Sequence, residues 1–484
     1  MARRAALTSL AIAPDSSYTR LVDARDDARF FATLRSTEYA RLDRANEAYL
    51  DFTGSALYAE SQITAHAERM RQGVFGNPHS ENGPSKLSTS IIDEARARVL
   101  SFLNASSDEY DVCFTANTTA AIKLVAESYP FGPRAPLVLA ADNHNSVNGL
   151  REFARRRGSA VAYIPLDEEL RLDNAEAHLR NARSARNHCV AASPGSEGLF
   201  AFPAQSNFSG VKHPLDLVYE AKSLGYSVLV DAAAFLPSSR LSLSAYPADF
   251  VVFSAYKILG YPTGVGALVG RKSSMARLER PWFAGGTVEY ASVQHGTHLL
   301  RAGPEAFEDG TPAFLSIAAL SDGLNFMESV GWRRMGRHIS SLTEYTLARL
   351  TALTHRNGNP RVRIHGPTGM RSRGGALAFN VLNPDGTAIP YAKVVDRASG
   401  QGVSLRGGCF CNPGAAEAAF DFPYAATARC LSAAATDGFS IDKFSQCLGP
   451  GVPVGAVRLS VGIPSNTADI DRAIDVIESV SISD

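Results

Sequence analysis

The chain has 484 residues, of which 45% are hydrophobic and 20% charged, a balance typical of folded globular proteins that excludes disordered and fibrous ones. Its 48 basic and 48 acidic side chains give a formal net charge of zero. Composition therefore gives no electrostatic reason to expect a nucleic-acid or anionic-membrane partner, and we expect neither. The length predicts two or three domains, or one large enzyme core with a smaller companion.

The targeting signals are weak. No apolar run approaches the roughly 20 residues that a membrane-spanning helix needs. Residues 1–14 carry two arginines before a short apolar stretch that Thr8 and Ser9 interrupt, which is a poor match to a signal peptide. We interpret this segment as a solvated arm and expect a cytoplasmic protein. Six cysteines are far fewer than a disulfide-stapled secreted domain carries.

Helices and short apolar strands alternate through residues 46–330. The predicted helices are 88–104, 118–128, 146–157 and 215–224, and the predicted strands are 111–115, 136–140, 160–164, 188–192, 227–230 and 250–253. This alternation predicts an α/β fold with a mostly parallel sheet that helices cover on both faces. We assign residues 46–330 to a large α/β domain.

The pattern changes near residue 312. The predicted elements there are long helices over 314–330 and 333–353, strands over 375–381 and 457–461, and a final helix over 467–480. We assign residues 331–484, together with 1–45, to a smaller α+β domain. In an open α/β sheet, ligands bind at the carboxyl ends of the strands. The residues that follow the predicted strands are therefore candidates for a site.

Three strand ends of the large domain carry polar residues. After 111–115, Thr118 and Thr119 open a helix whose free N–H groups suit a phosphate, although the same turn is also an ordinary N-cap. His144 follows 136–140, where a single histidine is often structural. Asp231 directly follows 227–230, where it either caps a turn or holds a buried cation.

Lys257 is the sharpest candidate, because it follows the strand 250–253 in Ser254-Ala-Tyr256-Lys257. A lysine among small residues at the edge of a sheet is partly desolvated, so its pKa falls and its amine becomes a usable nucleophile. The chain has only eight lysines, and Lys272 looks like a solvated loop cation instead.

Together, these strand ends meet the needs of pyridoxal 5′-phosphate (PLP). That cofactor requires a lysine for a Schiff base, an acid facing its pyridine nitrogen and an anion site for its phosphate. Lys257, Asp231 and the Thr118–Thr119 turn supply these three groups, and His144 adds an aromatic ring. The sequence therefore predicts a PLP enzyme.

Several ordered stretches resemble the class V aminotransferase group of PLP enzymes, and within it the cysteine desulfurases and the PLP domain of molybdenum cofactor sulfurases. Besides those of Asp231 and Lys257, they are Tyr49-Leu-Asp-Phe, Gly76-Asn-Pro-His-Ser80, Gln205-Ser-Asn207-Phe-Ser-Gly, Glu308-Asp-Gly-Thr311-Pro, Arg406-Gly-Gly-Cys409-Phe-Cys411 and Val457-Arg458-Leu-Ser. The likeness covers most of the chain. It implies a PLP-dependent transferase of fold type I (aspartate aminotransferase-like), with a large seven-stranded sheet.

The resemblance also implies how the cofactor is held. Lys257 binds PLP covalently, and Asp231 faces its pyridine nitrogen. His144 lies over the cofactor face, and Asn207, with Gln205 as a further candidate, meets its phenolic oxygen. The implied phosphate ligands are Thr118, Thr119, Ser254 and Tyr256, with Thr311 from a second subunit. That last role implies a homodimer.

The implied reaction converts L-cysteine to L-alanine. Cys411 aligns with the cysteine that takes the sulfur as a persulfide and passes it to an acceptor, while Lys257 shuttles the α-proton. Arg458 resembles the arginine that binds the substrate carboxylate, a role suited to a bidentate guanidinium. The catalytic candidates are Lys257, Cys411 and His144, and the substrate-binding candidates are Arg458, Arg406, Asn77 and His79. Arg406 also favours a thiolate nearby, and Cys409 is either a relay thiol or a bystander.

Two positions depart from many desulfurases. Those enzymes carry a glutamine where this chain has Ala234, and a histidine before the lysine where it has Tyr256. Both differences agree with the molybdenum cofactor sulfurase branch. Because sulfurases of higher organisms carry an additional C-terminal domain, the acceptor stays open between that cofactor, a protein and a small molecule.

The remaining cysteines allow a structural interpretation. Cys409, Cys411, Cys430 and Cys447 lack the paired C-x2-C spacing of zinc sites, so we favour no metal. Cys113 and Cys189 are expected to be buried and inert. Residues 415–454 look like an insertion that shapes the mouth of the site.

Two other functions remain open at this stage. The first is another class V reaction in a specialised pathway (epimerisation, C–S lysis or transamination), with Cys411 incidental. The second is a non-catalytic scaffold for thiols or metal.

Overall fold

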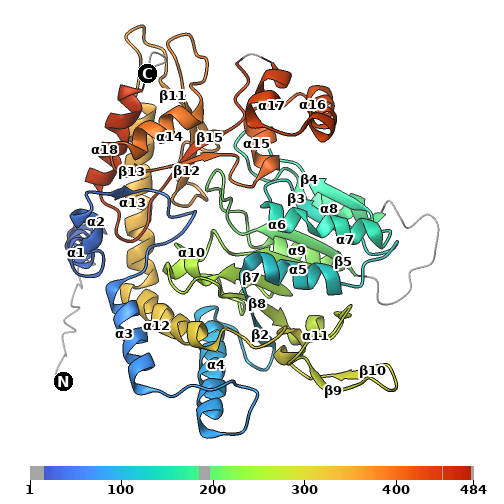
Figure 1. Ribbon diagram of the computed structural model, residues 1–484. Coiled ribbons are helices and arrows are strands. Elements are labelled where there is room, and N and C mark those ends of the chain that lie inside the picture. The colour runs from blue at the N-terminus through green and yellow to red at the C-terminus, as the bar shows by residue number, and fades with distance from the viewer. Residues whose placement is uncertain (1–15, 185–196, 450, 481–484) are drawn as a thin grey trace, which may run out of the picture.

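The computed structural model describes residues 16–184, 197–449 and 451–480 (Figure 1). The predicted strand over 188–192, Cys189 and the segment interpreted as an N-terminal arm lie outside these residues. None of the described helices combines the length and the apolar character needed to span a bilayer.

A seven-stranded sheet forms the centre of the larger part of the molecule, in the order β2-β8-β7-β6-β5-β3-β4. Its strands are β2 (Tyr110–Thr115), β3 (Leu137–Ala140), β4 (Val161–Ile164), β5 (Gly198–Pro203), β6 (Tyr226–Asp231), β7 (Phe250–Ser254) and β8 (Gly266–Arg271). Neighbouring strands run parallel, except that β8 is antiparallel to both β2 and β7. The predicted α/β fold with a mostly parallel seven-stranded sheet is confirmed.

The sequence pattern did not predict strand β5. It is buried along its whole length, and its alternate residues enter two different cores: Phe200 and Phe202 pack in one, Leu199 and Ala201 in the other. Strands β3, β6 and β7 are equally buried and match predicted strands, so burial does not set β5 apart. Its end residues do, because Gly198 and Pro203 are types that strands disfavour.

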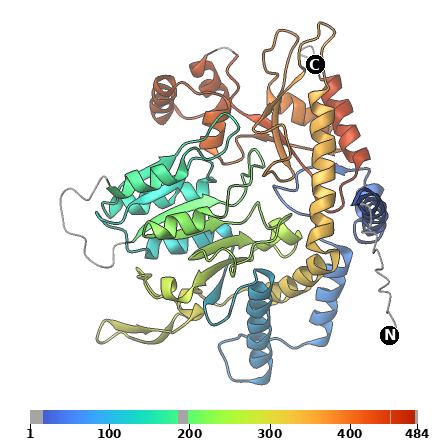
Figure 2. The same ribbon diagram turned by 180° about the vertical axis from the view of Figure 1, so that it is seen from behind.

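Helices lie on both faces of this sheet (Figures 1 and 2). They are α4 (Gly83–Phe102), α5 (Thr118–Ser128), α6 (Asn145–Asn148), α7 (Leu150–Arg156), α8 (Ala175–Ser184), α9 (Leu217–Ser223), α10 (Ala255–Leu259) and α11 (Lys272–Met275). Helix α3 (Glu60–Gln72) and helix α12 (Phe314–Val330) pack together, and α12 leads through Gly331 into the long α13 (Trp332–Thr351). The predicted helix over 146–157 is split into α6 and α7 at Gly149.

A four-stranded antiparallel sheet forms the C-terminal part, in the order β11-β12-β15-β14. Its strands are β11 (Val362–His365), β12 (Ala376–Val381), β14 (Arg406–Gly408) and β15 (Ala456–Ser460), with helices α13, α14 (Tyr391–Ser399) and α18 (Thr467–Ser479) nearby. The short β1 (Ala48–Tyr49) pairs with β13 (Val403–Ser404), and Asp51 forms a bridge with Ser460. Residues 48–51 thus pair with C-terminal strands, whereas the predicted large domain began at residue 46.

The remaining elements lie around these two sheets. They are α1 (Ser16–Glu38), α2 (Ala40–Arg44), a hairpin of β9 (Val288–Ser292) and β10 (Thr297–Leu300), a 3-10 turn (Pro304–Phe307), α15 (Pro413–Ala419), α16 (Tyr424–Asp437) and α17 (Ile441–Leu448). Helices α16 and α17 occupy the insertion-like segment and are joined by a disulfide between Cys430 and Cys447. The four-thiolate zinc site is therefore not formed, because two of its sulfur atoms are bonded to each other.

Candidate active site

A cavity of about 190 Å³ lies at the carboxyl ends of β2, β6 and β7. It is lined by Asn117, Thr118, Thr119, His144, Ser146, Asp231, Ala233, Ser254, Tyr256 and Lys257. The structure thus brings together all the predicted PLP ligands except Asn207, its further candidate Gln205, and Thr311, none of which lines this cavity. This convergence follows from the topology, because parallel strands end at the same edge of the sheet.

One end of the cavity is built to hold an anion. Helix α5 begins there, and Thr118 and Thr119 of its first turn line the cavity beside the hydroxyl of Ser254. Ser254 Oγ accepts a hydrogen bond from Thr118 N at 2.8 Å and lies 2.6 Å from Thr118 Oγ1. The turn packs so closely on β8 that a Cβ at Gly266 would lie 2.5 Å from the carbonyl carbon of Asn117.

Lys257 enters the cavity from the first turn of α10, directly after β7. Burial lowers the pKa of its amine, the carboxylate of Asp231 opposes this shift, and the guanidinium of Arg458 adds to it. A lowered pKa increases the share of neutral amine at physiological pH, which is the nucleophilic form.

Asp231 and His144 complete the cavity. Asp231 is buried at the end of β6, and its Oδ1 accepts a hydrogen bond from Ala233 N at 2.9 Å. His144 Nδ1 accepts from Ser146 N at 3.1 Å, which fixes the ring at the start of α6. Burial lowers the pKa of His144, and the charge of Lys257 lowers it further, whereas Asp231 raises it. The imidazole is therefore neutral at pH 7 and presents a flat aromatic face.

The Cys411 loop approaches the same cavity. Cys411 is exposed, and its carbonyl accepts a hydrogen bond at 2.7 Å from the N–H of Asn145, the residue after His144 of the cavity. Cys409 is half-buried and donates to the carbonyl of Val454 at 3.1 Å. Burial, with a smaller contribution from Cys411, raises the pKa of Cys409 to about 11. Cys409 therefore stays protonated at neutral pH, and Cys411 is the accessible thiol of the pair.

Arg458 and Arg406 share one carboxylate. The two arginines face each other across β14 and β15, and Asp51 lies between them. Arg458 Nη2 is 2.8 Å from Asp51 Oδ1, and Arg406 Nη2 is 2.6 Å from Asp51 Oδ2. Arg458 also donates to the carbonyl of Asn207 at 2.8 Å, and its guanidinium lies 4.7 Å from the ring centre of Phe410. Arg458 is thus buried and oriented, whereas Arg406 is half exposed.

Several predicted site residues lie outside the 190 Å³ cavity of their own chain. Asn207 donates through Nδ2 to the carbonyl of Phe410 at 2.7 Å and so contacts the Cys411 loop. Asn77 and His79 are exposed, and Asn77 Nδ2 lies 3.4 Å from Thr311 Oγ1. Thr311 lines a separate cavity of about 330 Å³, which the other side of the α5 turn also lines.

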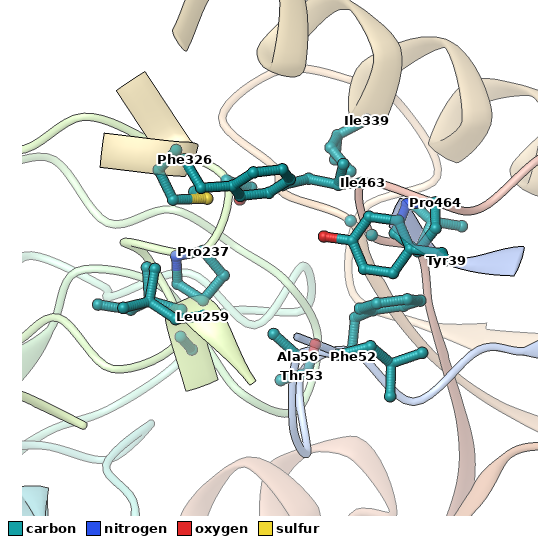
Figure 3. Close-up of a pocket in the computed structure, with 18 of the residues that line it drawn as sticks. Tyr39, Phe52, Thr53, Ala56, Pro237, Leu259, Phe326, Ile339, Ile463 and Pro464 are labelled. Carbon is teal, nitrogen blue, oxygen red and sulfur yellow. The ribbon is translucent and has the colours of Figure 1, made fainter. Parts of the chain in front are cut away.

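Gln205 lines a third, apolar cavity of about 40 Å³, which has room for about one water molecule (Figure 3). This cavity lies where α10, α12 and α13 meet the loops that follow β1 and β15, and the Tyr39 hydroxyl points into it toward Pro237 and Phe326. Ala234 lines it as well. Ala234, where many desulfurases carry a glutamine, therefore borders this apolar cavity and not the cofactor cavity.

Sequence reasoning missed some residues of the site. Ser146 and Asp142 stood in the strand-end stretch that singled out His144, and Asp51 stood in a family motif, but none of the three was given a role. All three are polar side chains within or beside a stretch that was already singled out, and that position is the signal that could have identified them. No local sequence pattern marks His213, which contacts the carboxylate of Asp142 from 71 residues away.

Comparison with known proteins places the chain in a family. Residues 48–472 match the family Aminotransferase class-V. The chain belongs to the class V aminotransferases. It is 38% identical over 467 residues to molybdenum cofactor sulfurase 3 of Aedes aegypti, covering 92% of this chain and 58% of that protein. It is 36% identical over 476 residues to the molybdenum cofactor sulfurase of Solanum lycopersicum, covering 92% and 56%. The chain therefore spans slightly less than three fifths of the length of these curated relatives.

Solved structures of cysteine desulfurases share the fold. The apo cysteine desulfurase of Thermococcus onnurineus NA1 superposes with a TM-score of 0.73 at 24% identity, covering 92% of this chain and 97% of that one. The cysteine desulfurase CsdA of Escherichia coli gives 0.71 at 20% identity, covering 93% and 97%. The predicted fold and the predicted family are both confirmed.

Proposed function

We propose that the protein is a PLP-dependent, cysteine desulfurase-like sulfurtransferase. It converts L-cysteine to L-alanine and transfers the sulfur as a Cys411 persulfide to an acceptor. One observation carries the proposal: a single cavity holds an amine of lowered pKa, a buried carboxylate and an anion-binding turn, and the loop of an exposed thiol, Cys411, is hydrogen-bonded to the residue after His144 of that cavity. The sequence similarity to molybdenum cofactor sulfurases supports it.

The cavity fits PLP by the chemistry of its donors. The helix N-terminus and hydroxyls of Thr118, Thr119 and Ser254 would hold the phosphate, and Lys257 would hold the cofactor covalently. Asp231 would pair with the pyridine nitrogen, since Ala233 N is the one described group that donates to its carboxylate. When bound, PLP supplies an electron sink that stabilises negative charge at the α-carbon of an amino acid.

The residues of this chain supply the remaining steps. Lys257 Nζ takes the α-proton of the substrate and later returns a proton. Cys411 Sγ attacks the substrate sulfur, so that an S–S bond forms as the C–S bond breaks, and the carbon is protonated to give alanine. Arg458 binds the substrate carboxylate. Its buried Nε has no hydrogen-bond partner among the described residues.

We further propose a cytoplasmic homodimer that acts without a nucleic-acid or membrane partner. Thr311 lines a cavity separate from the cofactor cavity of its own chain, with Asn77 Nδ2 3.4 Å from its Oγ1, so its predicted role at the phosphate requires a second copy. The zero net charge agrees with the absence of a nucleic-acid partner. Light scattering tests the dimer, and a monomer with full activity would contradict this role.

Turnover of L-cysteine by the purified protein tests the central proposal. Equal amounts of alanine and protein-bound persulfide are the expected products. Pyruvate and ammonia in place of alanine would establish C–S lysis instead. The molybdenum cofactor is the first acceptor to add, because it stands in the names of the relatives.

A pair of cysteine variants assigns the thiol. Cys411→Ala should abolish the persulfide while the visible absorbance of bound PLP persists. Cys409→Ala is the matched control and should keep both, because its thiol stays protonated. If the Cys411 variant transfers sulfur at the normal rate, the assignment is wrong.

A further inference from the structure

Asp142 lies at the meeting point of three loops around the proposed active site. Its carboxylate is fully buried and accepts hydrogen bonds from both sides. Ser206 Oγ and Asn412 Nδ2 donate to Oδ1 at 2.8 and 2.7 Å, and His213 Nε2 lies 2.8 Å from Oδ2. Asp142 belongs to the loop of His144, Ser206 to the loop of Asn207, and Asn412 to the loop of Cys411. One carboxylate thus joins the loops that carry three predicted site residues.

The contact through Asn412 fixes the backbone next to Cys411. The same Asn412 amide donates to Asn207 Oδ1 at 3.0 Å, and Asn207 in turn donates to the carbonyl of Phe410. On the other side, the carbonyl of Cys411 accepts from Asn145 N at 2.7 Å. The peptide groups on both sides of the thiol-bearing residue are therefore held by hydrogen bonds.

The backbone of this loop shows why such contacts are needed. Phe410 and Cys411 have φ values of 54° and 55°, in the left-handed region that residues with a side chain rarely adopt. Such conformations persist only where the surroundings impose them, and they cluster at functional sites. The loop also packs tightly, because a Cβ at Gly414 would lie 2.2 Å from the carbonyl oxygen of Ala141, next to Asp142.

A buried carboxylate is costly unless its hydrogen bonds are satisfied. Here three side chains contact the carboxylate of Asp142: the hydroxyl of Ser206, the imidazole of His213 and the amide of Asn412. Both the oxygen and the nitrogen of the Asn412 amide form hydrogen bonds. Its side-chain oxygen accepts from Ala415 N at 3.2 Å and caps α15, while its nitrogen faces Asp142. The chain therefore fixes this amide in one orientation.

We infer that Asp142 is a positioning residue for Cys411, acting through Asn412 to hold the strained loop that presents the thiol to Lys257. The inference rests on the proposed role of Cys411 and adds the group that determines where this thiol lies. His213 and Ser206 hold the Asp142 carboxylate in place.

Asn412→Asp is the decisive variant. It keeps the oxygen that caps α15 and the volume of the side chain, but it replaces the donor that faces Asp142 with a second carboxylate oxygen. We expect hydrogen exchange of the 409–414 backbone and of the Asn145 amide to rise at least tenfold in the cofactor-free protein. The rate at which iodoacetamide alkylates Cys411, followed by peptide mass spectrometry, should change with it. Persulfide formation should fall by roughly 100-fold, the effect expected of a misplaced reacting group, while bound PLP keeps its absorbance.

The double variant Asp142→Asn/Asn412→Asp reverses donor and acceptor. It should recover part of the lost persulfide formation and exchange protection, as a direct pair interaction requires, but not all, because the new carboxylate oxygen at 412 still faces Asn207 Oδ1 and the carbonyl of Asp142. Asp249→Asn is the matched control, since Asp249 is a buried carboxylate at the amino end of β7, paired with Lys222 and Ser274. It should leave exchange and alkylation in the Cys411 loop unchanged.

The outcomes separate this inference from the proposed function. Unchanged exchange and alkylation in the Asn412 variant would overturn the inference, as would faster exchange with normal persulfide formation or a double variant that recovers nothing. If the wild-type protein forms no persulfide, the proposed function fails. The positioning of the thiol is then decided by exchange, alkylation and the double variant alone.

Discussion

Asp51→Ala tests whether one carboxylate holds both arginines of β14 and β15. Arg458 keeps only 2% of its side chain exposed and Arg406 keeps 48%. Removing a partner from a buried ion pair costs about 3–5 kcal/mol, because the remaining charge stays buried. An exposed pair contributes about 1 kcal/mol or less. Nearly all of the loss in the Asp51 variant should therefore come from Arg458.

These free energies convert to a measurable shift in the melting temperature. With an unfolding entropy of about 2.1 cal/mol/K per residue, a chain of this length has a total near 1 kcal/mol/K. We expect Asp51→Ala to lower the melting temperature by about 3–5 °C in thermal unfolding followed by circular dichroism. Asp51→Asn keeps an acceptor and should fall between this value and wild type.

Arg406→Met is the control, because it removes only the half-exposed ion pair of Arg406 with Asp51. It should shift the melting temperature by about 1 °C or less. The KM for L-cysteine should rise in Asp51→Ala, because Arg458 loses the group that orients it. The reasoning is refuted if Asp51→Ala and Arg406→Met destabilise the protein equally.

Three further predictions concern the amine, the disulfide and the anion-binding turn. Burial lowers the pKa of Lys257 in the folded state. At a pH below that pKa, burying the charged amine costs folding free energy, and this penalty disappears as the pH rises to 10.5, the ordinary pKa of lysine. Cofactor-free Lys257→Met should therefore melt above wild type at pH 7, by a margin that narrows at pH 9.5; a constant margin would contradict this. Replacing both Cys430 and Cys447 with serine should make residues 424–448 more sensitive to limited proteolysis, since a loop of this size loses about 3 kcal/mol of constraint; an unchanged cleavage rate would show that the bond is absent. Gly266→Ala should weaken PLP binding at least tenfold in absorbance titrations by displacing Asn117, and unchanged affinity would exclude this close contact.

The sequence predicted those parts of the fold that depend on local pattern. Helix α5 has the predicted bounds, and Lys257 and Asp231 line one cavity because one lies just after β7 and the other ends the parallel strand β6. The family resemblance pointed to Cys411 on the basis of a short motif. In each case, neighbouring residues in the chain carry the information.

The sequence could not show what depends on contacts across the fold. Asp142 meets His213 and Asn412 over separations of 71 and 270 residues, and no local pattern encodes such a meeting. Arg458 was expected to bind the substrate carboxylate, and nothing in the sequence showed that it also pairs with Asp51, 407 residues earlier. Strand β5 was missed for a different reason, since Gly198 and Pro203 at its two ends are residue types that strands disfavour.

The contact of Gly414 with Ala141 has a consequence for protein engineering. The thiol-bearing segment has its shape only against the loop of Asp142, so it is not a cassette that can be grafted alone onto another scaffold. A designer who moves Cys411 into a related enzyme must transplant the opposing loop and its acidic residue as well.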